Sequence, residues 1–115
     1  MKDINGKIQY RDKEYKIVFN LNVMEAIQAE YGTMEKWGDL TDGSAGEPDA
    51  KAVIFGIREM LNEGIDIDND ENGTDIPFFT HKQVGRLVTE AGLRNVTEEM
   101  NKTVIESTQS AEKNM

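Results

Sequence analysis

Large apolar side chains in the first third of the chain recur first with the period of a strand and then with that of a helix. Between residues 15 and 20 every second side chain is large and apolar, which predicts a half-buried strand, and residues 8–10 supply a shorter partner strand across a polar turn. From residue 22 to residue 31 the apolar positions share one helical face, and Asn22 is the expected N-cap. The pattern therefore predicts a β-hairpin that leads into an amphipathic helix.

Three further amphipathic segments predict helices with recognisable ends. The strongest covers residues 49–63 and is expected to end at Gly64. The next has the best-defined start, because Thr80 and Gln83 have the spacing of a capping box. A last helix is expected to start near Asn95 or Thr97. The intervening loops are expected at 39–49 and, as a second acidic loop, at 65–76.

The order of these segments predicts an α+β fold in which an N-terminal β-hairpin packs on a bundle of about four α-helices. A length of 115 residues is typical of one domain, and residues 1–107 are expected to form it. The apolar stripe of the last helix is thin, so residues 108–115 are expected to be a flexible, frayed C-terminal tail. Trp37, the only tryptophan, is expected at the edge of the core rather than on a binding surface.

The composition narrows the class of protein. The chain has no cysteine, which excludes disulfides and cysteine-ligated zinc. It also has no run of about 20 apolar residues that could span a membrane, and its first residues lack the pattern of a signal peptide. We therefore expect a soluble, intracellular protein.

The net charge of −9 comes from the middle of the chain. Residues 39–76 carry two basic and eleven acidic side chains, whereas the segments on either side are balanced. Nucleic-acid-binding proteins normally show a basic stripe, and anionic membranes repel acidic surfaces, so neither is an expected partner. The acidic middle is either a pair of solvated loops or a surface that steers a basic protein partner.

Residues suited to catalysis or metal binding are few. Residues 68–73 have the spacing of the first half of an EF-hand calcium loop, but Phe79 stands where that loop needs its bidentate carboxylate. His81 is the only histidine, and no serine is accompanied by an activating base. We therefore expect no catalytic residue, no metal site and no cofactor, and a protein that is not an enzyme.

A binding role requires an apolar surface, and the central predicted helix offers a candidate. Phe55 lies off the buried arc of this helix, and Ala52 and Gly56 form a face of small residues suited to receiving another chain. The alternative is that Phe55 packs under a neighbouring loop. With two further apolar residues expected outside the core, the predicted partner-binding set is Ala52, Phe55, Gly56, Phe78 and Ile105.

Several segments resemble the tail assembly chaperones of long-tailed (siphovirus-type) phages and prophages. The resemblance lies in the order and spacing of the strands, of a helix that ends in Glu30-Tyr31-Gly32, and of the two helices that follow, and it extends over about residues 5–105. It includes no signature of reactive residues, and the acidic stretch is longer than is usual for the family. The matching segments are 5–7, 15–22, 30–32, 52–61 and 80–92.

The resemblance implies a non-catalytic protein that binds the tape measure protein, keeps it soluble and promotes assembly of the tail tube, with the tail-tube protein as a further partner. It implies residence in the host cytoplasm and absence from the mature virion. Many members of the family are made in two lengths by ribosomal frameshifting, and this chain would be the shorter product. A homo-oligomer is left open.

Two other classes of function are also open. One is a small acidic phage-encoded regulatory or inhibitor protein that binds a basic surface of a host protein. The other is a calcium-responsive module built on the partial EF-hand spacing. The first would depend on acidic side chains, whereas a chaperone would depend on apolar ones.

Overall fold

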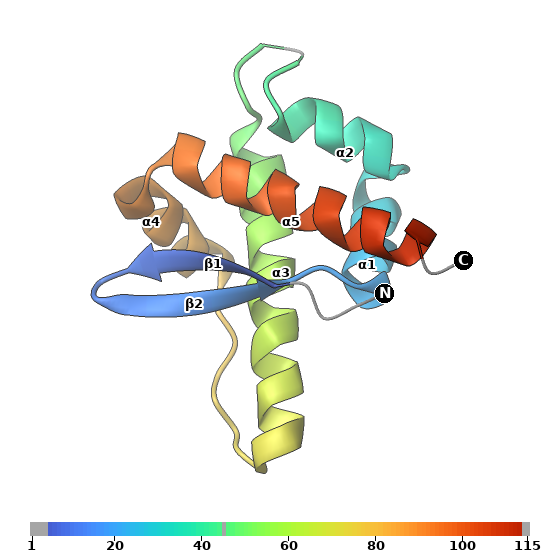
Figure 1. Cartoon of the computed structure of the whole chain (residues 1–115). Coiled ribbons are helices and arrows are strands. Elements are labelled where there is room, and N and C mark those ends of the chain that lie inside the picture. The colour runs from blue at the N-terminus through green and yellow to red at the C-terminus, as the bar shows by residue number, and fades with distance from the viewer. Residues whose placement is uncertain (1–4, 45, 114–115) are drawn as a thin grey trace.

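The computed structural model describes residues 5–44 and 46–113 and has an α+β fold (Figure 1). Within these residues an antiparallel two-stranded hairpin is followed by five helices, where about four were expected. The elements are β1 (Asn5–Tyr10), β2 (Lys13–Val18), α1 (Leu21–Tyr31), α2 (Met34–Thr41), α3 (Ala50–Asn72), α4 (His81–Ala91) and α5 (Leu93–Lys113).

The hairpin forms where the alternating pattern predicts it. Ile8 of β1 lies opposite Tyr15 of β2 in the antiparallel register. Arg11 and Asp12 form the two-residue turn with φ angles of 51° and 62°, the left-handed conformation that matches the twist of the flanking strands. Ile8 and Ile17 are buried on the same face of the hairpin, so this face packs on the helices.

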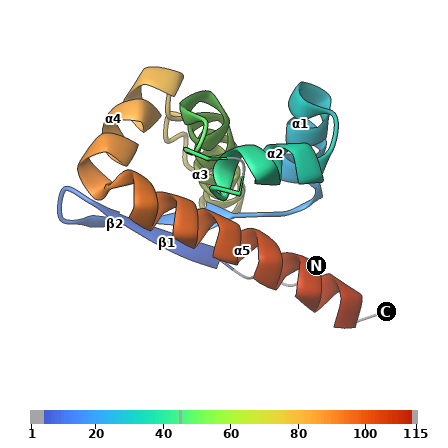
Figure 2. The ribbon, with the colours of Figure 1, turned by 90° about the horizontal axis from the view of Figure 1, so that it is seen from above.

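Helix α3 is the centre of the fold and contacts β2 and each of the other four helices (Figures 1 and 2). In the view from above, α4 lies on one side of α3, α1 and α2 lie on the other, and α5 runs past it together with the hairpin. Ile57, Met60 and Leu61 of α3 are buried. A helix surrounded in this way holds the rest of the chain in place, because most of the core packs against it.

The predicted end of the central helix at Gly64 is wrong, because α3 continues to Asn72. Gly64 is buried against β2, where a Cβ atom would lie 3.2 Å from the carbonyl oxygen of Lys16. The glycine therefore permits close packing of helix on strand and does not stop the helix. Residues 65–72, expected in an acidic loop, are helical, and the connection to α4 is limited to residues 73–80.

The two predicted N-caps have different outcomes. The capping box is confirmed: the Gln83 N–H donates to the Thr80 hydroxyl at 3.2 Å, and the Thr80 N–H donates to the Gln83 side chain at 2.8 Å. For α1 the expected cap is wrong, since Asn20 rather than Asn22 accepts a hydrogen bond from the Val23 N–H. The earlier cap adds two residues, Leu21 and Asn22, to the start of the helix.

Helix α5 is longer than the sequence pattern suggested. It begins at Leu93 and runs to Lys113, so residues 108–113 continue the last helix where a frayed tail was expected. Residues 114 and 115, the rest of the expected tail, lie outside the described part of the chain.

Candidate functional site

The distal part of α3 projects beyond the hairpin, and the connection to α4 runs back beside it (Figure 1). This connection, residues 73–80, has no helix or strand structure of its own. Its position therefore depends on side chains that hold its backbone groups, because exposed connections are otherwise mobile.

Two asparagines of α3 hold this connection. Asn62 donates from Nδ2 to the carbonyl oxygen of Phe79 at 3.1 Å and accepts the Phe79 N–H on Oδ1 at 2.8 Å. Asn69 bonds Ile76 in the same way, with both distances 3.0 Å. Each amide thus satisfies both backbone groups of one residue. We call these two pairs, Asn62–Phe79 and Asn69–Ile76, the asparagine clamps.

The spacing of the asparagine clamps matches a helix to an extended chain. The two asparagines are seven residues apart, which is about 10.5 Å along a helix axis. Their partners are three residues apart, which is about 10 Å of extended chain. The segment from Ile76 to Phe79 runs antiparallel to α3, because Asn62 pairs with Phe79 and Asn69 with Ile76. Since the two lengths agree, both pairs can form at the same time. A hydroxyl contact from Thr74 to Asn69 Oδ1 at 2.8 Å adds a further support at the distal end.

The side chains of the clamped connection differ in how far they are exposed. Phe79 turns toward the hairpin and contacts Tyr15 edge-on, with ring centroids 5.4 Å apart. Ile76 and Phe78, by contrast, are 52% and 53% exposed. We call Ile76 and Phe78 the apolar pair; both are exposed apolar side chains on an otherwise acidic arm.

A shallow cavity of about 210 Å³ adjoins Phe78 of the apolar pair. Phe78 lines one part of it, the start of α1 lines another, and α3 forms the floor. The residues that line it are Asn22, Val23, Glu59, Asn62, Glu63, Asp66 and Phe78. Apolar and acidic groups are therefore presented together at this surface.

Two of the predicted partner-binding residues, Ala52 and Gly56, are buried, so the prediction that they form an open receiving face is wrong. The face is covered by Trp37, whose indole N–H donates to the Ala52 carbonyl oxygen at 3.0 Å. A Cβ atom on Gly56 would lie 2.4 Å from Trp37 Cζ2. Trp37, expected at the edge of the core, is 1% exposed and therefore lies inside it.

Phe55 is partly buried and packs against other side chains of the fold. The Tyr31 ring meets it edge-on at 5.6 Å, and the Arg58 guanidinium lies 5.5 Å from its centroid. Burial raises the pKa of the Tyr31 hydroxyl, with Asp49 and Glu30 adding to the shift, so this phenol is neutral at pH 7. Phe55 therefore packs against α1, which is close to the alternative in which it lies under a neighbouring segment.

The remaining predicted residues lie on different elements. Phe78 is in the connection between α3 and α4, and Ile105 is on α5, where it is 54% exposed. Sequence reasoning did not include Ile76, Asn62 or Asn69. Asparagines seven residues apart lie close to the same helix face, which is a signal for a paired contact once the helix is known to extend past Gly64.

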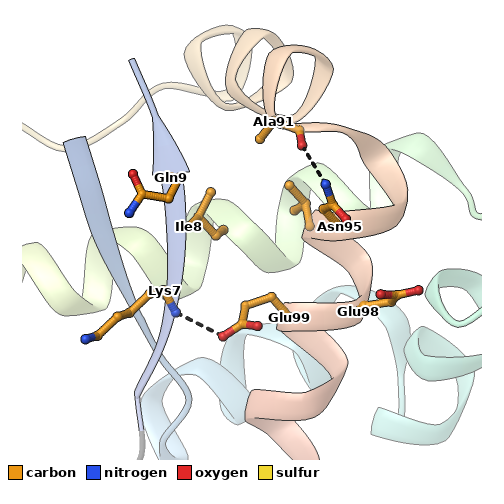
Figure 3. Close-up of a pocket in the computed structure, with 8 residues that line it drawn as sticks. Lys7, Ile8, Gln9, Ala91, Asn95, Glu98 and Glu99 are labelled. Carbon is orange, nitrogen blue, oxygen red and sulfur yellow. Dashed lines mark hydrogen bonds between the residues drawn. The ribbon is translucent and has the colours of Figure 1, made fainter. Parts of the chain in front are cut away.

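A second cavity, of about 340 Å³, lies between β1 and α5 (Figure 3). Glu99 of α5 points toward β1 and accepts the backbone N–H of Lys7 at 3.2 Å. Strand edges carry unpaired backbone groups that must be covered. This cavity is therefore the place where α5 covers the free edge of β1.

Two features that the sequence led us not to expect are a metal site and a membrane-spanning helix. In residues 5–44 and 46–113 no three His, Cys, Asp or Glu side chains are arranged to hold a metal ion. Residues 68–72, the core of the partial EF-hand spacing, are helical and do not form a calcium loop. Across the described part of the chain, no helix combines the length and the apolar character that crossing a bilayer requires.

Comparison of the chain with protein-family models, with curated proteins and with solved structures gave no match. Similarity therefore assigns no function to this chain, and its own residues must indicate one.

Proposed function

We propose that this chain is a non-catalytic polypeptide-binding protein that acts as a tail assembly chaperone of a long-tailed phage or prophage, binding the tape measure protein and promoting assembly of the tail tube. The observation that carries the proposal is the apolar pair, two exposed apolar side chains in a connection whose backbone the asparagine clamps hold at Ile76 and Phe79. Exposed apolar groups on a rigid support are typical of protein-binding sites.

The proposed role requires that the protein bind apolar surfaces of its partner and that the resulting complex stay soluble. A long helical protein exposes apolar stripes until the tube covers them, and a helper must bind such stripes reversibly. The apolar pair offers a small contact of this kind. The net charge of −9 helps to keep the complex dispersed in solution.

Replacing Phe78 by serine should weaken capture of the tape measure protein by about tenfold or more, because burying a phenylalanine is worth about 1.5–3 kcal/mol. The measurement is co-expression with the tape measure protein of the same phage genome, followed by affinity purification and quantification of the soluble complex. Ile76→Ser should act in the same direction with a smaller effect.

The matched control for this experiment is Leu93→Ser, which removes an exposed apolar side chain from the start of α5. It should leave capture unchanged. Failure of the unaltered chain to capture or solubilise the tape measure protein would overturn the proposal. Loss of capture on Ile105→Ser, with Phe78→Ser silent, would move the site to α5.

A second candidate function is a regulatory or inhibitor protein that binds a basic host surface. The observation in its favour is the distal half of α3, where Asp66, Asp70 and Glu71 are exposed and only Asp68 has an ion pair among the described residues, with Lys16 at 2.8 Å. An inhibitor of this kind should lose its effect on Asp66→Asn plus Asp70→Asn and tolerate Phe78→Ser. The proposed chaperone cannot tolerate Phe78→Ser.

A further inference from the structure

We infer that the apolar pair and the acidic side chains beside it form one docking site for a cationic amphipathic helix, in which an apolar stripe is flanked by lysine or arginine. The inference rests on the proposed function, because it takes the partner to be a polypeptide. It adds the chemical character of the segment that binds.

The cavity beside Phe78 is lined by three acidic side chains and by no basic one. Glu59, Glu63 and Asp66 come from successive turns of one side of α3, and Phe78 closes the cavity from the connection. Residues three and four apart on a helix are neighbours, so these carboxylates form one negative strip. The apolar Phe78 ring and this row of carboxylates therefore line the same cavity.

The charge of this strip is largely uncompensated within the described residues. Glu63 accepts hydrogen bonds from the side-chain amides of Asn20 and Asn22, which are neutral donors and leave its charge in place. Glu59 lies 3.8 Å from Arg58, a long contact between partly exposed groups. Asp66 is exposed and has no ion pair in the described part of the chain.

The combination of these groups selects the occupant. A purely apolar segment that covered Phe78 would remove carboxylates from water without a counter-charge, which is unfavourable. An acidic segment would be repelled. A helix with basic side chains beside its apolar stripe buries the apolar pair and places a cation opposite each carboxylate, and the negative strip also speeds its approach.

The test is fluorescence anisotropy with three labelled synthetic 18-residue helical peptides: a leucine stripe flanked by lysine, the same stripe flanked by glutamate, and the lysine peptide with its leucines replaced by serine. The first should bind about tenfold more tightly than either of the others at low salt. Its affinity should fall as salt rises from about 50 to 300 mM, because screening weakens exposed ion pairs.

Variants locate the binding to this surface. Glu59→Gln with Asp66→Asn should weaken binding of the lysine–leucine peptide about fivefold or more and flatten its salt dependence. Phe78→Ser should weaken it about tenfold without changing the salt dependence. Glu106→Gln and Leu93→Ser, which change exposed side chains on α5, are the controls and should have no effect. Circular dichroism checks that each variant is folded.

Each other outcome overturns the inference. If the glutamate peptide bound equally well, the carboxylates would not select a basic partner. If the serine peptide bound equally well, the apolar pair would not contribute to binding. If the tape measure protein is captured in co-expression but the peptides show no preference, the inference fails and the proposed function stands; if capture also fails, both are wrong. A dimer in sedimentation that Phe78→Ser dissociates would make a second copy of the chain the occupant.

Discussion

Replacing Trp37 by alanine should lower the free energy of unfolding by about 3–5 kcal/mol, a large part of the stability of a domain of this size. The ring is 1% exposed and lies over Ala52 and Gly56, so its removal leaves a cavity that α2 and α3 cannot fill without moving. The substitution also leaves the Ala52 carbonyl without its indole donor. Urea denaturation followed by circular dichroism measures the loss.

Gly56 provides an independent check on this contact. Gly56→Ala should destabilise the protein by about 1–3 kcal/mol through overpacking, although alanine favours a helix over glycine by about 1 kcal/mol. Its Cβ would meet Trp37 Cζ2 at 2.4 Å and Met100 Sδ at 3.1 Å. In the Trp37→Phe background the smaller ring makes room, so the two changes should combine to less than their sum. Additive effects would show that ring and glycine are not in contact.

Replacing Asn62 by alanine should destabilise the connection between α3 and α4 by about 2 kcal/mol, because two partly buried hydrogen bonds to Phe79 are lost together. Asn62→Asp should be as damaging, since a carboxylate faces the Phe79 carbonyl oxygen with no proton to donate. Hydrogen exchange is the direct measurement: the Phe79 amide should exchange much faster while the amides of central α3 stay protected.

Loss of the asparagine clamps should also weaken partner binding, and Asn69→Ala tests this without changing a residue that lines the cavity beside Phe78. Asn69→Ala frees Ile76 in the same way that Asn62→Ala frees Phe79, and a mobile apolar pair must be ordered when the partner binds. Asn95→Ala is the matched control, because it removes one exposed asparagine contact, to the Ala91 carbonyl at 3.3 Å. It should change neither exchange nor binding. Unchanged exchange at Phe79 in Asn62→Ala would contradict the assignment of the clamp.

The sequence pattern was sufficient to predict the elements that are determined by residues close together in the sequence. The hairpin follows from alternation and a short polar turn, and the start of α4 follows from the hydrogen-bonding reach of Thr80 and Gln83. In these cases the residues that determine the structure lie within a few positions of one another.

The tertiary structure decided the rest, because the determining contacts join distant residues. A glycine in a helix is unfavourable by about 1 kcal/mol in isolation, which is why Gly64 looked like an end; packing against Lys16 of β2 outweighs that cost. Ala52 and Gly56 have the same pattern whether a partner or Trp37 covers them. Asn62 and Asn69, on two turns of α3, hold the backbone of Phe79 and Ile76, and that contact depends on the path of the chain in space and not on local preference.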